Sequence, residues 1–193
     1  GQKIWWENTR NSILLKINSL HCIAMTTMTT TTTINPSLRV TLLQPGLIWE
    51  DKEANLGKIS GMLENLPGTD IILLPEMFST GFSMDVEMLA ENMEGPTVGW
   101  MKQKAAEMDA VLAGSLIIRE NDQYFNRLIW ARPDGELQWY DKKHLFTMGE
   151  EHLHYHPGNQ RVTVEWKGWK VRLLVCYDLR FPELFRVAAV RTD

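Results

Sequence analysis

The chain has 193 residues, a formal net charge of −4 and a hydrophobic share of 44%, which suits one domain with a sizeable core. No basic stripe predicts a nucleic-acid partner, and no apolar run is long enough to predict a membrane span. The two cysteines, Cys22 and Cys176, lie far apart in the sequence and form no disulfide framework, so we expect a reducing, cytoplasmic environment.

Residues 1–37 differ from the rest of the chain. They include a threonine-rich tract at 26–33, which has no amphipathic period and cannot bury one face. We interpret residues 1–37 as a disordered leader or a segment introduced by cloning, and residues 38–193 as the folded domain. The alternative for the leader is a helix over residues 4–23 that packs on the domain.

From residue 38 onward, apolar runs alternate with helical patterns. The runs at 38–43, 71–74 and 110–118 are predicted strands, and the second is apolar throughout, as expected for a strand that is buried on both faces. Apolar residues recur between them at helical spacing, at Leu56, Ile59, Leu63 and Leu66 and again at Val98, Met101, Ala105 and Met108. Strands and helices that alternate in this way predict an α/β fold.

Two hairpins are predicted in the second half of the chain, each at a turn signal between two strand-like runs. The paired runs are 124–131 with 136–140 and 162–165 with 170–175. The turns between them are Arg132-Pro-Asp-Gly135 and Trp166-Lys-Gly-Trp169. Hairpins that follow an alternating strand–helix part imply a mixed sheet with helices on its faces.

A reactive thiol is predicted at the end of the last strand. The apolar run 171–175 stops at Cys176, and a polar turn follows, with Pro182 near the start of a predicted helix. Backbone N–H groups and the helix dipole at such a place stabilise a thiolate or an adjacent oxyanion. The alternative is that Cys176 is a small core residue, as most free cysteines are.

Two other strand ends carry polar groups of a complementary kind. Glu76 follows the run 71–74, and Lys142 follows the first hairpin. Taken singly, the first suits a solvated or helix-capping carboxylate and the second a surface lysine. Together with Cys176 they supply a base, a cation and a nucleophile, the minimum set for acyl transfer through a covalent intermediate. Sites in open α/β sheets gather at the carboxyl ends of strands, where all three are predicted to lie.

Three segments give the chain a resemblance to a known family. They are Leu74-Pro-Glu-Met-Phe78, Tyr140-Asp-Lys-Lys-His-Leu-Phe146 and Val175-Cys-Tyr-Asp-Leu-Arg-Phe-Pro-Glu183. In order and approximate spacing they resemble the signature segments of the nitrilase (carbon–nitrogen hydrolase) superfamily. The resemblance implies a nitrilase-like αββα sandwich with mixed sheets, and hydrolysis of a small-molecule amide without a cofactor.

By this resemblance Glu76 is the general base, Cys176 the nucleophile and Lys142, rather than Lys143, the catalytic lysine. Glu76 would take the thiol proton, pass it to departing ammonia and then activate water against the thioester. The Lys142 ammonium and the backbone N–H of Tyr177 would hold the oxyanion of the tetrahedral intermediate.

The family's second buried glutamate matches Glu151 better than Glu150. The segment Glu-His-Leu-His-Tyr from Glu151, followed by a turn at Gly158, resembles the omega-amidase branch. Members of that branch hydrolyse the terminal amide of 2-oxoglutaramate and 2-oxosuccinamate. Nitriles or N-carbamoyl amines are the alternative substrates within the superfamily.

A substrate of the omega-amidase kind carries a carboxylate, so a cation near the pocket is needed. Arg180 is the candidate, because a guanidinium presents a planar fork that suits a carboxylate. The alternative is that Arg180 forms a structural ion pair with Glu183 or Asp178.

Three alternating histidines raise the question of a metal. His152, His154 and His156 would share one face of a strand, and with Cys176 they would offer zinc ligands. No Cys-x-x-Cys or His-Glu-x-x-His spacing accompanies them, so we expect no metal.

Chains of this family continue well past the helix after the cysteine, whereas this chain stops at Asp193. We therefore expect a sandwich that is incomplete at its C-terminus, with an inert binding or assembly module as the alternative to an enzyme. The helix after the cysteine would be apolar on more than one face, which predicts a homodimer or larger assembly. Its apolar residues are Phe181, Leu184, Phe185, Val187, Ala188 and Val190.

Overall fold

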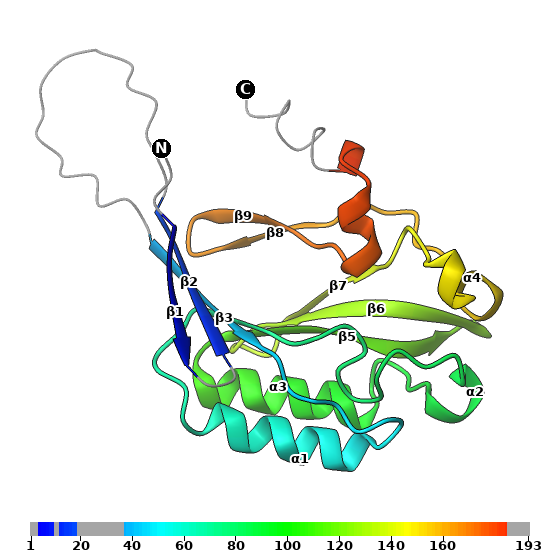
Figure 1. The fold of residues 1–193 in the computed structure, drawn as a ribbon, viewed down its shortest axis with the longest axis horizontal. Coiled ribbons are helices and arrows are strands. Elements are labelled where there is room, and N and C mark those ends of the chain that lie inside the picture. Colours follow the sequence, from blue (N-terminus) through cyan, green and yellow to red (C-terminus); the bar gives the residue numbers. More distant parts are fainter. Residues whose placement is uncertain (1–3, 10–11, 19–36, 185–193) are drawn as a thin grey trace, which may run out of the picture.

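The computed structural model describes residues 4–9, 12–18 and 37–184, which form a seven-stranded sheet and the elements packed on it (Figure 1). β3, β4 and β5 run parallel to one another, and the other neighbouring pairs are antiparallel. The predicted α/β fold with a mixed sheet is therefore confirmed. The strands lie side by side in chain order as β1 (Ile4–Thr9), β2 (Ser12–Asn18), β3 (Ser37–Leu43), β4 (Ile71–Leu73), β5 (Val111–Glu120), β6 (Gln123–Ala131) and β7 (Leu137–Asp141).

Two helices cover one face of this sheet (Figure 1). α1 (Lys52–Leu63) lies between β3 and β4 in the chain, and α3 (Pro96–Met108) lies between β4 and β5, as the parallel pairing of these strands requires. The carboxylate of Asp51 caps α1 by accepting the N–H of Ala54 at 3.0 Å. α3 starts with a proline, which has no N–H to leave unpaired. In the ranges that the structure describes, no helix is long and apolar enough to cross a bilayer.

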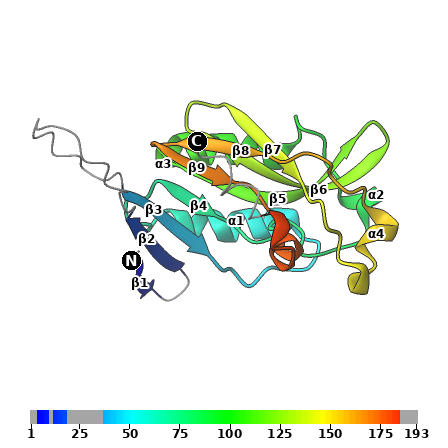
Figure 2. The ribbon, with the colours of Figure 1, turned by 90° about the horizontal axis from the view of Figure 1, so that it is seen from above.

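The opposite face of the sheet is covered by a second hairpin (Figures 1 and 2). It consists of β8 (Thr163–Trp166) and β9 (Trp169–Arg172), which pair in a separate two-stranded sheet. Val164 of this hairpin packs with Trp130 and Tyr140 of the main sheet in a buried cluster. Helices, main sheet and hairpin thus form three layers. The predicted helix after the cysteine is described only as far as Leu184, so its apolar positions at 185–190 lie outside the described residues.

Side chains of β5 show how one strand serves both faces. Val111 and Ala113 belong to the buried cluster on the hairpin side, whereas Leu112 and Leu116 belong to the cluster on the helix side. This is the alternation that a strand imposes on its side chains. Ser115 therefore faces the hairpin side, where the polar side chains described below are found.

One predicted strand is shorter than expected. β9 ends at Arg172, whereas we expect a strand that continues to Val175. The N–H of Leu173 still donates to the Val162 carbonyl at 3.1 Å, but the N–H of Val175 donates to the carboxylate of Asp178, also at 3.1 Å. A buried side chain thus takes the place of a neighbouring strand, and the chain leaves the ladder before Cys176. The other predicted strands and both hairpins are confirmed within two residues at each end.

The N-terminal stretch forms two strands where the structure describes it. β1 pairs with β2, and β2 pairs with the edge of β3, so the alternative of a helix over 4–23 is wrong for residues 4–9 and 12–18. The threonine-rich tract and Cys22 lie outside the described residues. The origin of residues 1–37 and the domain boundary at residue 38 stay predictions.

Candidate active site

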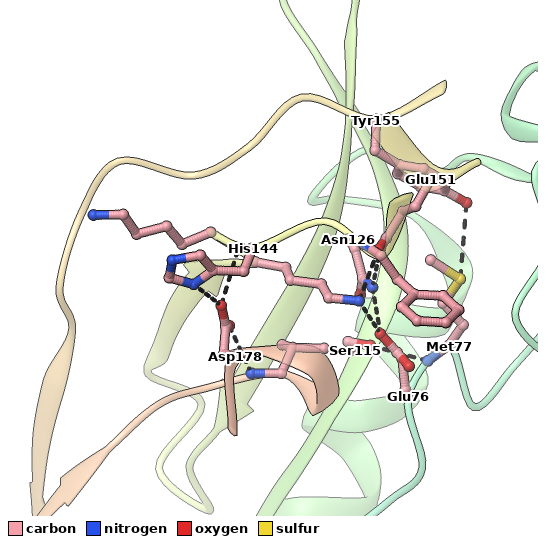
Figure 3. A network of polar contacts seen from close by, with 12 residues as sticks. Glu76, Met77, Ser115, Asn126, His144, Glu151, Tyr155 and Asp178 are labelled. Atoms are coloured by element: carbon pink, nitrogen blue, oxygen red, sulfur yellow. Dashed lines mark hydrogen bonds and ion pairs between the residues drawn. The ribbon is translucent and has the colours of Figure 1, made fainter. Parts of the chain in front are cut away.

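Glu76 lies in the turn that follows β4. The N–H of Met77 donates to the hydroxyl oxygen of Ser115 on β5 at 2.9 Å, and Met77 adopts a φ of 47°, in the left-handed region. Non-glycine residues adopt this conformation only when their surroundings impose it. The bent turn places the Glu76 carboxylate, whose side chain is 19% exposed, beside Asn126 of β6 (Figure 3) and beside Lys142, which follows β7.

Lys142 directly follows β7 and is held through its backbone on both sides. Its N–H donates to the Asn126 carbonyl, and its carbonyl accepts the N–H of Gly158, both at 2.9 Å. Its side chain is fully buried, and its Nζ lies 2.8 Å from Oε1 of Glu76 and 2.8 Å from Oε2 of Glu151. The structure thus brings together the predicted base, lysine and second glutamate (Figure 3).

Glu151 is the first residue of α4 (Glu151–His154), and it is fully buried. Its Oε2 accepts the N–H of Phe146 at 2.6 Å, and its own N–H donates to the Phe146 carbonyl at 3.3 Å. This reciprocal pair fixes the loop between β7 and α4. The neighbouring Glu150 is exposed, so Glu151 is the glutamate that joins the site.

Asn126 is part of this cluster, although the sequence analysis does not identify it. Its Nδ2 donates to Oε1 of Glu76 at 2.8 Å and to Oε1 of Glu151 at 2.9 Å, and the residue is 0% exposed. Asn126 lies in the middle of β6, on the same face as Leu128 and Trp130. A polar residue beside Leu128 and Trp130 on the inward face of the strand was the signal that could have revealed it.

Cys176 lies opposite this cluster on a short 3₁₀ turn, Cys176–Arg180. Its φ of 39° is in the left-handed region, which turns the chain sharply and leaves the thiol exposed. Beside it is a cavity of about 260 Å³, and half of its lining residues are aromatic. The lining residues are Glu76, Phe82, Lys142, Phe146, Cys176 and Tyr177.

The electrostatics of the site keep the thiol protonated. Desolvation, the charge of Glu76 and a hydrogen bond with Glu76 raise the pKa of Cys176, and the charge of Lys142 opposes them without reversing the shift. This shift does not favour a thiolate. Cys176 lies in a 3₁₀ turn of five residues, and the charged groups that act on its thiol are Glu76, Lys142 and Glu151. The expectation that backbone N–H groups at this turn hold an adjacent oxyanion stays a prediction.

Lys142 remains an ammonium in this site. Burial alone would lower its pKa, but the charge of Glu76 and the hydrogen bonds with Glu151 and Glu76 outweigh burial and raise the pKa. A protonated thiol beside a carboxylate, with a permanent cation on the same carboxylate, is an arrangement suited to nucleophilic attack assisted by a general base.

Asp178 joins the cysteine turn to the segment that carries the lysine (Figure 3). Its buried carboxylate accepts the hydroxyl hydrogen of Tyr140 at 2.8 Å, the N–H of His144 at 2.9 Å and the N–H of Val175 at 3.1 Å. Desolvation and the charge of Asp178 raise the pKa of Tyr140, so this hydroxyl stays a donor. The position of Cys176 relative to Lys142 is thereby set by hydrogen bonds to one side chain.

The two remaining predicted site residues are placed differently. Within residues 37–184, the backbone N–H of Tyr177 donates to no other group, which leaves it available to an oxyanion. Arg180 is exposed and does not line the cavity at Cys176. The alternative of an ion pair with Asp178 or Glu183 is not present in the part of the chain that the structure describes. The role of Arg180 stays a prediction.

The histidines do not share one face of a strand. His152 and His154 lie on α4, and His156 follows it in a loop, so these residues do not form the strand face on which the zinc alternative depended. Over the ranges 4–9, 12–18 and 37–184, no group of three His, Cys, Asp or Glu side chains is arranged to hold a metal ion.

The sequence matches one family model and several characterised proteins. The model is that of carbon-nitrogen hydrolases, and it matches residues 39–192. The chain is 47% identical over 148 residues to the omega-amidase YafV of Escherichia coli (strain K12), covering 76% of this chain and 57% of that protein. It is 33% identical over 120 residues to the 2-oxoglutaramate amidase of Bacillus subtilis (strain 168), covering 61% of this chain and 46% of that protein.

A solved structure gives a similar result. XC1258 from Xanthomonas campestris, a CN-hydrolase superfamily protein with an arsenic adduct in its active site, matches with a TM-score of 0.73 at 48% identity. The match covers 76% of this chain and 56% of that chain. The chain spans about half the length of the curated relatives it matches.

Proposed function

Because the chain belongs to the carbon–nitrogen hydrolase family, we propose that it hydrolyses the terminal amide of short dicarboxylate monoamides such as 2-oxoglutaramate. The observation that carries the proposal is the carboxylate of Glu76, which is held by Lys142 at 2.8 Å beside the thiol of Cys176. The similarity to an omega-amidase and to a 2-oxoglutaramate amidase supports the substrate class.

The first chemical step in this proposal is acylation of the cysteine. Cys176 sulfur attacks the amide carbon while Glu76 takes the thiol proton, which suits a thiol whose pKa is raised. The C–S bond forms and the carbonyl becomes an oxyanion, held by the Lys142 ammonium and the N–H of Tyr177. Glu76 then gives its proton to the amide nitrogen, the C–N bond breaks and ammonia leaves.

The second step is hydrolysis of the thioester. Glu76, which is again a carboxylate, removes a proton from water as the water oxygen attacks the thioester carbon. The C–S bond breaks, the carboxylic acid leaves and Cys176 regains its proton. Lys142 stays charged through both steps because its pKa is raised, so it serves as a fixed cation rather than as a proton donor.

The cavity limits which acyl groups suit the site. Its volume of about 260 Å³ suits a short acyl chain, and the rings of Phe82, Phe146 and Tyr177 suit an apolar methylene stem. We propose Arg180 as the partner of the distal carboxylate of the substrate. Arg180 does not line the cavity, so it would contact this carboxylate at the outside of the cavity.

The proposal is tested by ammonia release from 2-oxoglutaramate, measured on the complete gene product beside a nitrile and an N-carbamoyl amine. We expect turnover of the omega-amide and loss of turnover in Cys176→Ser. Turnover of only the nitrile or the N-carbamoyl amine would contradict the substrate class and leave the family unaffected.

The alternative to an enzyme is an inert binding or assembly module. Absence of turnover with every amide tested, in a folded protein, would support it. For either candidate we propose a homodimer or larger assembly in the cytoplasm, with no nucleic-acid or membrane partner. A monomer in sedimentation at micromolar concentration would contradict the assembly.

A further inference from the structure

We infer that Asn126 is a positioning residue that holds Glu76 and Glu151 in one arrangement around Lys142 and thereby leaves a single oxygen of Glu76 to accept the thiol proton. The inference deepens the proposed function, because it concerns the same site. It rests on the hydrogen bonds of four side chains that meet in the interior (Figure 3).

These four side chains form a closed ring of hydrogen bonds. Asn126 Nδ2 donates to Oε1 of Glu76 and to Oε1 of Glu151, and Lys142 Nζ donates to Oε1 of Glu76 and to Oε2 of Glu151. An amide nitrogen carries two hydrogens, so both donors of Asn126 are used on carboxylates. Two carboxylates repel each other, and a neutral donor shared between them keeps them in place without adding a charge.

The orientation of the Asn126 amide is fixed by the same contacts. A rotation by half a turn would put its oxygen against two carboxylate oxygens, which repel it. As placed, Asn126 Oδ1 is buried and has no hydrogen-bond partner among residues 37–184, which destabilises the fold. The neighbours on this face of β6, Leu128 and Trp130, are apolar. An apolar residue would avoid the lost hydrogen bond, so the amide is explained by the carboxylates that it holds.

The ring also distinguishes the two oxygens of Glu76. Oε1 accepts from Asn126 at 2.8 Å and from Lys142 at 2.8 Å. Within residues 37–184, neither Asn126 nor Lys142 donates to Oε2, so Oε2 is the oxygen left for the thiol of Cys176. Without Asn126, Glu76 is held only by Lys142 and can rotate, so that either oxygen meets the lysine.

The test compares Asn126→Ala with a matched control, Leu128→Ala, on the same face of the same strand but packed in the apolar cluster on the hairpin side. We expect Asn126→Ala to lower kcat about 10–100-fold, the range typical for partners that orient a reactive group. KM should change little, because Asn126 does not line the cavity.

A third variant, Asn126→Asp, separates the effect of the lost amide donor from the effect of a smaller side chain. It has the same shape but places a third carboxylate against the other two, so its kcat should be lower than that of Asn126→Ala. In Leu128→Ala kcat should stay close to that of the unaltered protein. A kcat within twofold of the unaltered protein in folded Asn126→Ala would overturn the inference.

Alkylation of Cys176 by iodoacetamide against pH gives a readout that needs no substrate. We expect its midpoint to fall in Asn126→Ala, because Glu76 no longer faces the thiol in one orientation, and to stay constant in Leu128→Ala. An unchanged midpoint in Asn126→Ala would overturn the positioning role even if the substrate is a different amide. Conversely, lack of turnover of 2-oxoglutaramate by the unaltered protein, with a lowered midpoint in Asn126→Ala, would contradict only the proposed function.

Discussion

The carboxylate of Asp178 accepts the hydroxyl hydrogen of Tyr140 at 2.8 Å, which links the turn that begins at Cys176 to the last residues of β7, next to Lys142. Both residues are buried. Cys176 and Lys142 are 34 positions apart in the sequence. The hydrogen bond between Tyr140 and Asp178 brings their segments together. The hydrogen bond therefore controls the distance across which the proposed reaction occurs.

Tyr140→Phe is expected to weaken that link. It removes one donor from a buried carboxylate, so we expect a loss of about 1–3 kcal/mol in the free energy of unfolding and a lower kcat, because Cys176 is held less firmly. Urea denaturation and ammonia release measure the two effects. Tyr124→Phe is the control, because Tyr124 is only half-buried. Equal stability of the two variants would contradict the role of the Tyr140 hydroxyl.

Glu76, Lys142 and Cys176 are expected to act as a unit. Cys176→Ser replaces the thiol with a hydroxyl that ionises far less readily, and turnover should fall by several orders of magnitude. Glu76→Gln cannot accept a proton and should stall both steps. Lys142→Ala removes the charge at the oxyanion, and loss of one such donor typically costs about 10²–10³ in rate. Steady-state rates of ammonia release measure all three variants.

Double variants of these residues and a change at the neighbouring Lys143 provide the controls. A double variant should be little worse than the worse single one, because the three groups serve one step. Lys143→Ala should keep its activity, since the buried Nζ beside both glutamates belongs to Lys142. Circular dichroism must accompany Lys142→Ala, which leaves two carboxylates without their cation. Loss of turnover in Lys143→Ala but not in Lys142→Ala, with both folded, would show that the lysine is assigned wrongly.

Alkylation of Cys176 is expected to be slow at neutral pH and to rise in alkaline solution. The thiol pKa is raised by desolvation and by Glu76, and only the thiolate reacts with iodoacetamide. The midpoint of the rate against pH should therefore lie above that of a free cysteine. In Glu76→Gln it should fall, because the charge that opposes ionisation is removed. A midpoint in Glu76→Gln above that of the unaltered protein would contradict this electrostatic account.

Arg180→Ala is expected to show whether Arg180 binds the distal carboxylate of the substrate or stabilises the fold. Arg180 is exposed, so the free energy of unfolding should change by less than about 0.5 kcal/mol. If Arg180 binds the distal carboxylate, KM should rise for 2-oxoglutaramate and not for a neutral amide of similar length. Arg161→Ala, at another exposed arginine, is the control. Equal KM values for 2-oxoglutaramate before and after the Arg180 change would refute its proposed role.

The sequence by itself determined the strands β3 to β7, both hairpins and the residues of the three signature segments. Apolar runs and turn signals are local, so the pattern of a few neighbouring residues is enough to predict them. Glu76, Lys142 and Cys176 stand at strand ends in recognisable segments, and for that reason they could be named before any geometry was known.

Only the tertiary structure decided what surrounds those residues. Asn126 donates to a glutamate 50 positions away, and Asp178 replaces a strand partner for Val175, which ends β9 early. The raised thiol pKa of Cys176 depends on desolvation and then on Glu76, 100 positions earlier in the chain. Hydrogen bonds and charge interactions of this kind depend on distances in space, and no local pattern of residues contains those distances.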